Sequence, residues 1–193
     1  MSIFTNIGKF NPGWKFTIFT AFILPILLSL SFWQYQRGLE KSKLESFINN
    51  QQTKPPTEFI SLEYASPSQW YRPFFMQGEF SKKTVLVDNA IYEGVRGFSV
   101  YQEFLSNNGL SLLVSKGWSN SFDNSKKTLD QNYLLQGVFR PIEKAFTIDN
   151  SIYEREGSDL EMQSFDINSI NLKWNTNFPA VVFELDEFSL DGF

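Results

Sequence analysis

Residues 97–118, GFSVYQEFLSNNGLSLLVSKGW, decide the fold class of this chain. Two runs rich in aliphatic and aromatic residues flank the segment SNNG at 106–109. Because Asn and Gly tolerate the positive φ angles that hairpin loops need, the stretch predicts two strands joined by a turn. Similar short apolar runs, bounded by turn residues, follow one another along the chain: WYRPFFMQGEF (70–80), TVLVDNAIY (84–92), NYLLQGVFRPI (132–142) and FPAVVFEL (178–185). We therefore predict a mostly β domain, a sheet or a barrel-like fold, with a short helix within 158–175 and a polar loop at 121–132.

A long uncharged segment precedes these strands. Residues 16–36, FTIFTAFILPILLSLSFWQYQ, lie between Lys15 and Arg37 and contain no formal charge. As a helix rising about 1.5 Å per residue, this segment would span roughly 31 Å, the thickness of a bilayer's hydrocarbon core. Trp33 and Tyr35 at its end are typical of the membrane interface. We predict one transmembrane helix at 16–36.

A cleaved secretory signal is the alternative for this segment, with Ser29-Leu30-Ser31 as a weak cleavage site. Secretory signals usually have a shorter apolar stretch and alanine at the cleavage site, which favours an uncleaved anchor. The sequence then predicts a short N-terminus at 1–15, a helical extension and linker at 37–57, and the β-rich domain at 58–193. The linker contains QQTKPPTE, in which two prolines exclude a helix.

The charge and residue content exclude several function classes. Residues 55–193 carry 11 basic and 19 acidic side chains, a net charge of −8, which disfavours binding to nucleic acid. The chain has no cysteine and no histidine, so it can form no Cys/His zinc site, no Ser-His-Asp triad and no His-ligated haem by itself. Acidic clusters at 154–161 and 184–187 are expected to be solvated surface. We expect no catalytic residues and no metal site.

Glycines beside the predicted strands are expected to have structural roles. Gly94, Gly97 and Gly117 are placed where glycine usually marks a tight turn, a bulge or the close approach of another backbone. Trp118 ends an apolar strand, which favours a buried position with a partner for its indole N–H.

The order of five motifs resembles the surfeit locus protein 1 family. The motifs are WQxxR at the end of the membrane helix, GxF at 78–80, VDN with GVRGFSV at 87–100, LLVSKGW at 112–118 and GVFRP at 137–141. The segment NFPAVVFELDEF also resembles the closing strand of that family, and Lys116 replaces an arginine that is frequent there.

This resemblance implies a membrane-anchored, non-enzymatic assembly factor of cytochrome c oxidase. It further implies a cytoplasmic or matrix N-terminus, a β domain in the periplasm or intermembrane space, and a part in delivering haem a to the oxidase's catalytic subunit. The expected partners are the lipid bilayer and that subunit or other assembly factors. The arginine-free start favours a bacterial inner membrane over a mitochondrial one. The alternative function is a membrane-anchored cell-envelope interaction module without a cofactor.

The resemblance also supplies candidate site residues. Family members continue into a second membrane helix with a proposed haem-ligating histidine, and this sequence stops before that helix, so the chain is expected to be either a truncated member or one that works without direct haem ligation. No haem ligand is therefore carried over, which leaves the cofactor-binding residues unknown and limits the expectation to transient contact with haem a. Arg37 is expected to pair with a haem propionate or a client carboxylate. The candidate positions are Trp33, Gln34, Arg37, Gly94, Gly97, Gly117, Trp118 and Arg140.

Overall fold

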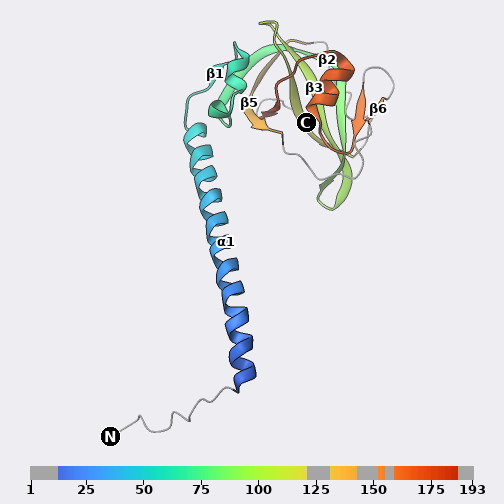
Figure 1. Ribbon diagram of the computed structural model, residues 1–193. Helices are drawn as coiled ribbons and strands as arrows, with labels where there is room; N and C mark the ends of the chain where they lie inside the picture. Colours follow the sequence, from blue (N-terminus) through green and yellow to red (C-terminus); the bar gives the residue numbers. More distant parts are fainter. Residues whose placement is uncertain (1–12, 121–130, 143–151, 155–158, 187–193) are drawn as a thin grey trace. The chain divides into compact units, whose positions relative to one another are not determined.

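The computed structural model describes residues 13–120, 131–142, 152–154 and 159–186 (Figure 1). The chain divides into two compact units, Met1–Phe47 and Ile48–Phe193. The predicted loop at 121–132 lies almost wholly outside the described residues.

The first unit is built on a single long helix, α1, which runs from Trp14 to Gln52 and continues into the start of the second unit. Pro25 lies inside the helix, where a membrane environment tolerates it. The predicted transmembrane segment 16–36 falls entirely within α1. By its length and composition α1 could span a membrane, and its apolar side chains are exposed rather than packed in a core.

The second unit is a closed five-stranded barrel with additional strands. The barrel strands are β2 (Pro73–Tyr92), β3 (Val95–Ser106), β4 (Ser111–Ser119), β5 (Tyr133–Pro141) and β8 (Val181–Leu185). They pair in the order β2-β3-β4-β8-β5, and β5 returns to β2. All pairs are antiparallel except β4 with β8, which is parallel. The predicted mostly β fold is confirmed, and closure into a barrel leaves these strands with few unpaired edges.

Shorter elements complete the unit. The strand β7 pairs parallel with β2 and antiparallel with β6, and β1 pairs parallel with the start of β2. The bounds are β1 Thr57–Glu58, β6 Ile152–Glu154, β7 Leu160–Met162, α2 Ile167–Trp174, and two 3₁₀ turns at Leu62–Ala65 and Pro67–Gln69. The helix expected within 158–175 is therefore α2.

The strand β2 corrects one detail of the sequence prediction. The segments 70–80 and 84–92 were expected as separate strands, but they form one strand of 20 residues. Its register with β3 shifts between Phe80 and Thr84 and again between Val87 and Ala90. Bulges of this kind bend a strand sharply, which allows one long strand to pair with β1, β3, β5 and β7 along its length.

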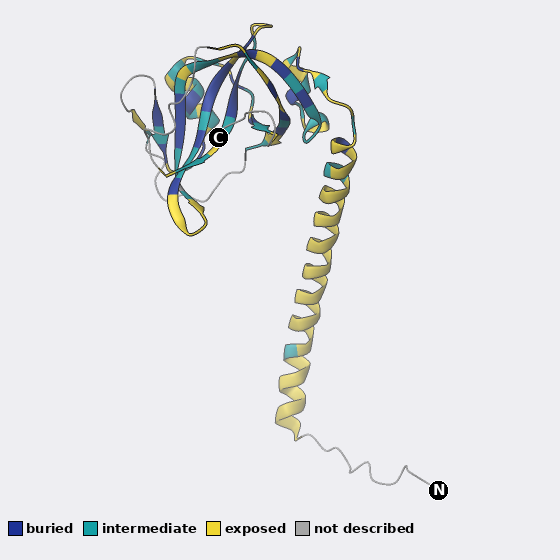
Figure 2. Cartoon of the chain, turned by 180° about the vertical axis from the view of Figure 1, so that it is seen from behind, coloured by how far each residue is buried: buried dark blue, intermediate teal, exposed yellow. Residues whose placement is uncertain are grey.

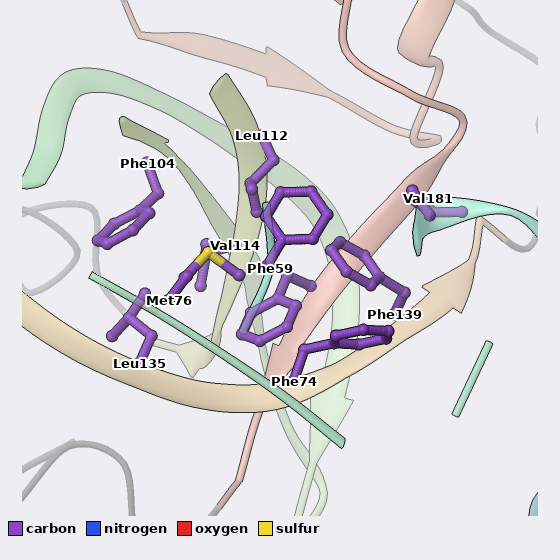
Figure 3. Close-up of a cluster of buried hydrophobic side chains, with 11 residues drawn as sticks. Phe59, Phe74, Met76, Phe104, Leu112, Val114, Leu135, Phe139 and Val181 are labelled. Atoms are coloured by element: carbon purple, nitrogen blue, oxygen red, sulfur yellow. The ribbon is translucent and has the colours of Figure 1, made fainter. Parts of the chain in front are cut away.

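The interior of the barrel is aromatic (Figure 3). Phe59, Phe74 and Phe139 are fully buried, with ring centroids 4.9–6.4 Å apart. Leu112 and Val114 of β4 belong to this cluster, whereas Leu113 between them belongs to a second cluster with residues of β7 and α2. The alternation follows from the two-residue period of a strand, which sends successive side chains to opposite faces. Both faces of β4 are thus buried.

Candidate functional site

The three candidate residues at the end of the predicted membrane segment are exposed on α1. Trp33 and Gln34 present exposed side chains, and Arg37 forms an ion pair with Glu40, with Nη1–Oε2 at 3.3 Å. An exposed pair of this type contributes little stability and leaves the guanidinium accessible. The expected contacts of these residues with a client or a propionate stay predictions.

Gly97 and Trp118 form a tightly packed pair. A Cβ atom on Gly97 would lie 2.4 Å from the Ser119 carbonyl oxygen and 2.7 Å from two indole carbons of Trp118. The indole N–H of Trp118 donates a hydrogen bond to the carbonyl of Ala90 at 3.1 Å. Gly97 thus permits the close approach predicted for it. Trp118 is only half-buried, so it packs at the surface against Ala90 of β2 and Gly97 of β3 instead of lying in the core.

Gly94 and Gly117 are the positions where the backbone needs positive φ. Gly94 (φ +79°) follows Glu93 (φ +49°) in the two-residue turn between β2 and β3. Two positive φ angles give the turn whose twist matches antiparallel strands. Gly117 (φ +91°) lies at a bulge, because β3 residues Val100 and Tyr101 pair with Gly117 and Ser115. These two predicted structural roles agree with the geometry.

Arg140 lies in an open cleft on the outer face of the barrel, which we call the Arg140 cleft. Its volume is about 430 Å³, within the range of small-molecule pockets. Tyr101, Ser115 and Glu184 lie on its floor, each paired in register with the next across β3, β4 and β8. The lining residues are Tyr71, Tyr101, Ser115, Arg140, Pro141, Ile142, Phe165, Val182 and Glu184.

Arg140 is held by two neighbours. Its Nη1 contacts Oε2 of Glu184 at 2.5 Å, and its guanidinium lies 6.0 Å from the ring centroid of Tyr71. Tyr71 has φ +65°, a rare conformation for a residue with a side chain, and its backbone N–H donates to the Phe139 carbonyl at 2.9 Å. The half-exposed ion pair offers both a cation and a carboxylate to a ligand.

Tyr101 supplies a neutral phenol at the base of the cleft. Burial raises its pKa above the ordinary value, the hydrogen bond with Ser99 opposes this rise, and the negative charge of Glu184 adds to it. Its ring packs edge-on against Phe165 with the centroids 4.6 Å apart. Because a high pKa keeps the hydroxyl protonated at neutral pH, Tyr101 is a hydrogen-bonding group here and not a phenolate.

Lys116 follows Ser115 in β4 but does not line the Arg140 cleft. Its Nζ is 3.1 Å from Oε1 of the buried Gln102 and 5.4 Å from the ring centroid of Phe80. Burial lowers the pKa of Lys116 to about 8. The ammonium is thus held against an aromatic face and an amide oxygen, both of which favour the charged form against desolvation.

The acidic clusters of the sequence have structural partners in the described residues. Glu154 forms an ion pair with Lys173, with Oε1–Nζ at 2.6 Å, and this contact lowers the pKa of Glu154. Asp159 is buried and accepts a hydrogen bond from the backbone N–H of Thr84 at 3.2 Å. The expectation of solvated surface is therefore wrong for Asp159, because this carboxylate satisfies a buried strand donor.

Comparison with known proteins now identifies the family. A family model described as the SURF1 family matches residues 21–191, from within α1 to beyond β8. The chain belongs to the SURF1 family. This confirms the resemblance to the surfeit locus protein 1 family, whose members are known for assembly of cytochrome c oxidase. A search of curated proteins found no match. Family and helix together point to a membrane-anchored assembly factor.

Two of the SURF1 motifs, LLVSKGW and GVFRP, and the closing strand contribute residues to the Arg140 cleft. Arg140 was a candidate, whereas Tyr71, Tyr101, Ser115 and Glu184 were not. Ser115 lies inside the LLVSKGW motif, and Tyr101 directly follows GVRGFSV. Their place within or next to a family motif is the signal that the sequence offered for both. Glu184 could be linked to Arg140 only through the pairing of β5 with β8.

The described residues offer no histidine, cysteine or accessible methionine for axial ligation of a haem iron. The chain has no histidine and no cysteine, and Met76 and Met162 are enclosed in the two apolar clusters. Tyr101 is a poor iron ligand because its raised pKa disfavours the phenolate. Within the described ranges, no three acidic side chains lie close enough together to hold a metal ion. No chemical step through iron is therefore assigned to this chain.

Proposed function

We propose that this protein assists maturation of the catalytic subunit of cytochrome c oxidase at the stage when haem a is delivered. It acts as a non-enzymatic assembly factor in a bacterial inner membrane, with the barrel in the periplasm. A mitochondrial inner membrane is the alternative location. The observation that carries the proposal is the match to the SURF1 family model, which includes both the end of α1 and the whole barrel.

The Arg140 cleft is the best-supported contact for the oxidase subunit or another assembly factor. Arginine recognises carboxylates through two parallel N–H donors, and an incoming acidic group would take over the contact now made by Glu184. Tyr71 and Tyr101 add aromatic surface and a hydroxyl donor, the residue type that is enriched in binding interfaces. The cleft is thus suited to an acidic peptide segment.

The shortage of iron-ligating side chains in the described residues favours a role in protein contact. With no histidine, cysteine or accessible methionine among the described residues, the chain would support haem a insertion by holding or presenting the client. Haem a supplies the redox chemistry of the oxidase once it is inserted, and the propionates could contact Arg37 or Arg140 only transiently.

Deletion and complementation test this proposal. Removing the gene from an organism that makes an aa3-type oxidase and has no second copy should lower the haem a absorbance band and the oxidase activity of membranes. The haem b-containing complexes should stay at wild-type levels. Restoring the chain should recover the activity, whereas Arg140→Glu should recover much less, because it places two carboxylates together and repels an acidic client.

Lys173→Glu is the matched control. Lys173 also forms a half-exposed ion pair between two elements, and its side chain is 45% exposed compared with 52% for Arg140. Both variants should accumulate and melt similarly, but only Arg140→Glu should lose complementation. If deletion leaves haem a and oxidase activity at wild-type levels, the assignment fails, and the cell-envelope interaction module without a cofactor takes its place.

A further inference from the structure

The turn between β2 and β3 exposes an apolar tip. Ile91, Tyr92 and Val95 are 74%, 57% and 51% exposed, and they surround the two-residue turn Glu93-Gly94. Figure 2 shows this turn projecting from the barrel as an exposed segment. Isolated exposed apolar residues are common, but here three lie within five residues at the end of one hairpin, with Tyr92 paired to Val95 and Ile91 on the opposite face. We call residues 91–95 the hairpin tip.

The hairpin that carries the tip is held in a fixed conformation. Tyr92 pairs with Val95 in register, and the ring of Tyr92 lies 5.6 Å from that of Trp118. Trp118 in turn packs on Gly97 and bonds to Ala90, at the base of the same hairpin. The turn backbone and the Tyr92 ring are therefore presented with little conformational freedom left to lose on binding, which favours association.

We propose that the hairpin tip inserts into the interface between lipid headgroups and acyl chains of the bilayer. The tip has the composition of an interfacial segment, because a tyrosine accompanies two aliphatic residues. The turn also carries Glu93, whose carboxylate would have to stay at the level of the headgroups, while Arg96 beside the tip pairs with Asp88 at 3.2 Å. This inference needs only the membrane anchor and is independent of the role in oxidase assembly.

A bilayer fits the tip better than a protein partner does. Three side chains are far too few for a stable protein interface, which buries about 1,200–2,000 Å² in total. Weak insertion suffices for a domain on the same chain as α1, because the anchor keeps the tip at a high effective concentration near lipid. The acidic barrel unit gives no general attraction to anionic lipid, so the apolar tip would have to supply the contact.

The absence of cysteine makes the test direct. A single cysteine introduced by Ile91→Cys in the full chain can carry an environment-sensitive fluorophore after reconstitution into phosphatidylcholine nanodiscs. Leu172→Cys on α2 is the matched control, because Leu172 is also aliphatic and is 83% exposed. Spin-labelled phosphatidylcholine should quench the label at residue 91 several-fold more strongly than the label at residue 172. Circular dichroism should show both labelled variants folded.

A second variant separates insertion from mere proximity. With the label at Val95→Cys, the added change Tyr92→Ser should reduce quenching, because it removes the interfacial aromatic group while leaving the turn glycine in place. Equal, weak quenching at residues 91 and 172 in lipid alone would overturn the proposal. Shielding of residue 91 that occurs only when the oxidase catalytic subunit is added would also overturn it, since the tip would then bind protein. Neither outcome would change the deletion phenotype, so the two proposals fail separately.

Discussion

Replacing Gly97 by alanine tests the packing that links the β2–β3 hairpin to Trp118. The new methyl group would meet the Ser119 carbonyl oxygen at 2.4 Å and the indole of Trp118 at 2.7 Å. The carbonyl belongs to the paired β4 strand, so it cannot move without disturbing the ladder, and the indole would move away from Ala90.

The expected loss of stability follows from three contributions. Overpacking of this kind costs about 1–3 kcal/mol, and weakening the Trp118–Ala90 hydrogen bond costs about 0.5–1.5 kcal/mol. Alanine also reduces the conformational freedom of the unfolded chain, which stabilises the folded state by about 0.4–1 kcal/mol. The net loss is about 2 kcal/mol, which for a unit of roughly 150 residues lowers Tm by about 4–8 °C.

The assay is thermal unfolding of the full chain in nanodiscs, followed by far-UV and near-UV circular dichroism. The near-UV signal should change for Gly97→Ala, because an indole changes its surroundings. Gly94→Ala is the control, since a Cβ there meets nothing within 4 Å and only the positive φ is strained. It should cost about 1 kcal/mol without changing the tryptophan signal. A Gly97→Ala melting temperature within error of wild type, with an unchanged near-UV spectrum, would refute the packing argument.

Three further predictions concern other parts of the chain. Because burial lowers the pKa of Lys116 to about 8, below its unfolded value of about 10.4, the folded state binds fewer protons between these pH values, and stability should rise with pH from about 8 to 10. Urea unfolding across this range should show the rise in wild type and a flatter profile in Lys116→Met, and equal slopes would contradict the burial of this ammonium. Asp159→Ala should cost about 1–3 kcal/mol by leaving the Thr84 N–H unsatisfied, whereas Asp159→Asn, which keeps an acceptor, should cost clearly less in the same denaturant titration. The protein should stay in the membrane fraction after carbonate washing, and recovery of a soluble form beginning near Phe32 would show that the segment is cleaved instead.

The hairpin between β3 and β4 was predictable because its signals are local. The turn residues at 106–109 and the apolar runs on each side report backbone preferences within a few positions, and the structure has Gly109 at φ +77° in that turn. The continuous strand β2 was not predictable, since its bulges are stabilised by pairing with β3, β5 and β7. Local propensity cannot distinguish a break between strands from a bulge inside one strand.

The sequence by itself determined the apolar helix, the mostly β domain and the family. Each of these depends on residue type, spacing or order along the chain. The tertiary structure alone decided that Arg140 meets Glu184 beside Tyr71 and Tyr101, and that Trp118 packs on Gly97. Barrel closure brings β8 between β4 and β5, so groups far apart in sequence share one face. That juxtaposition is set by strand register and twist, which are fixed only when the whole sheet closes.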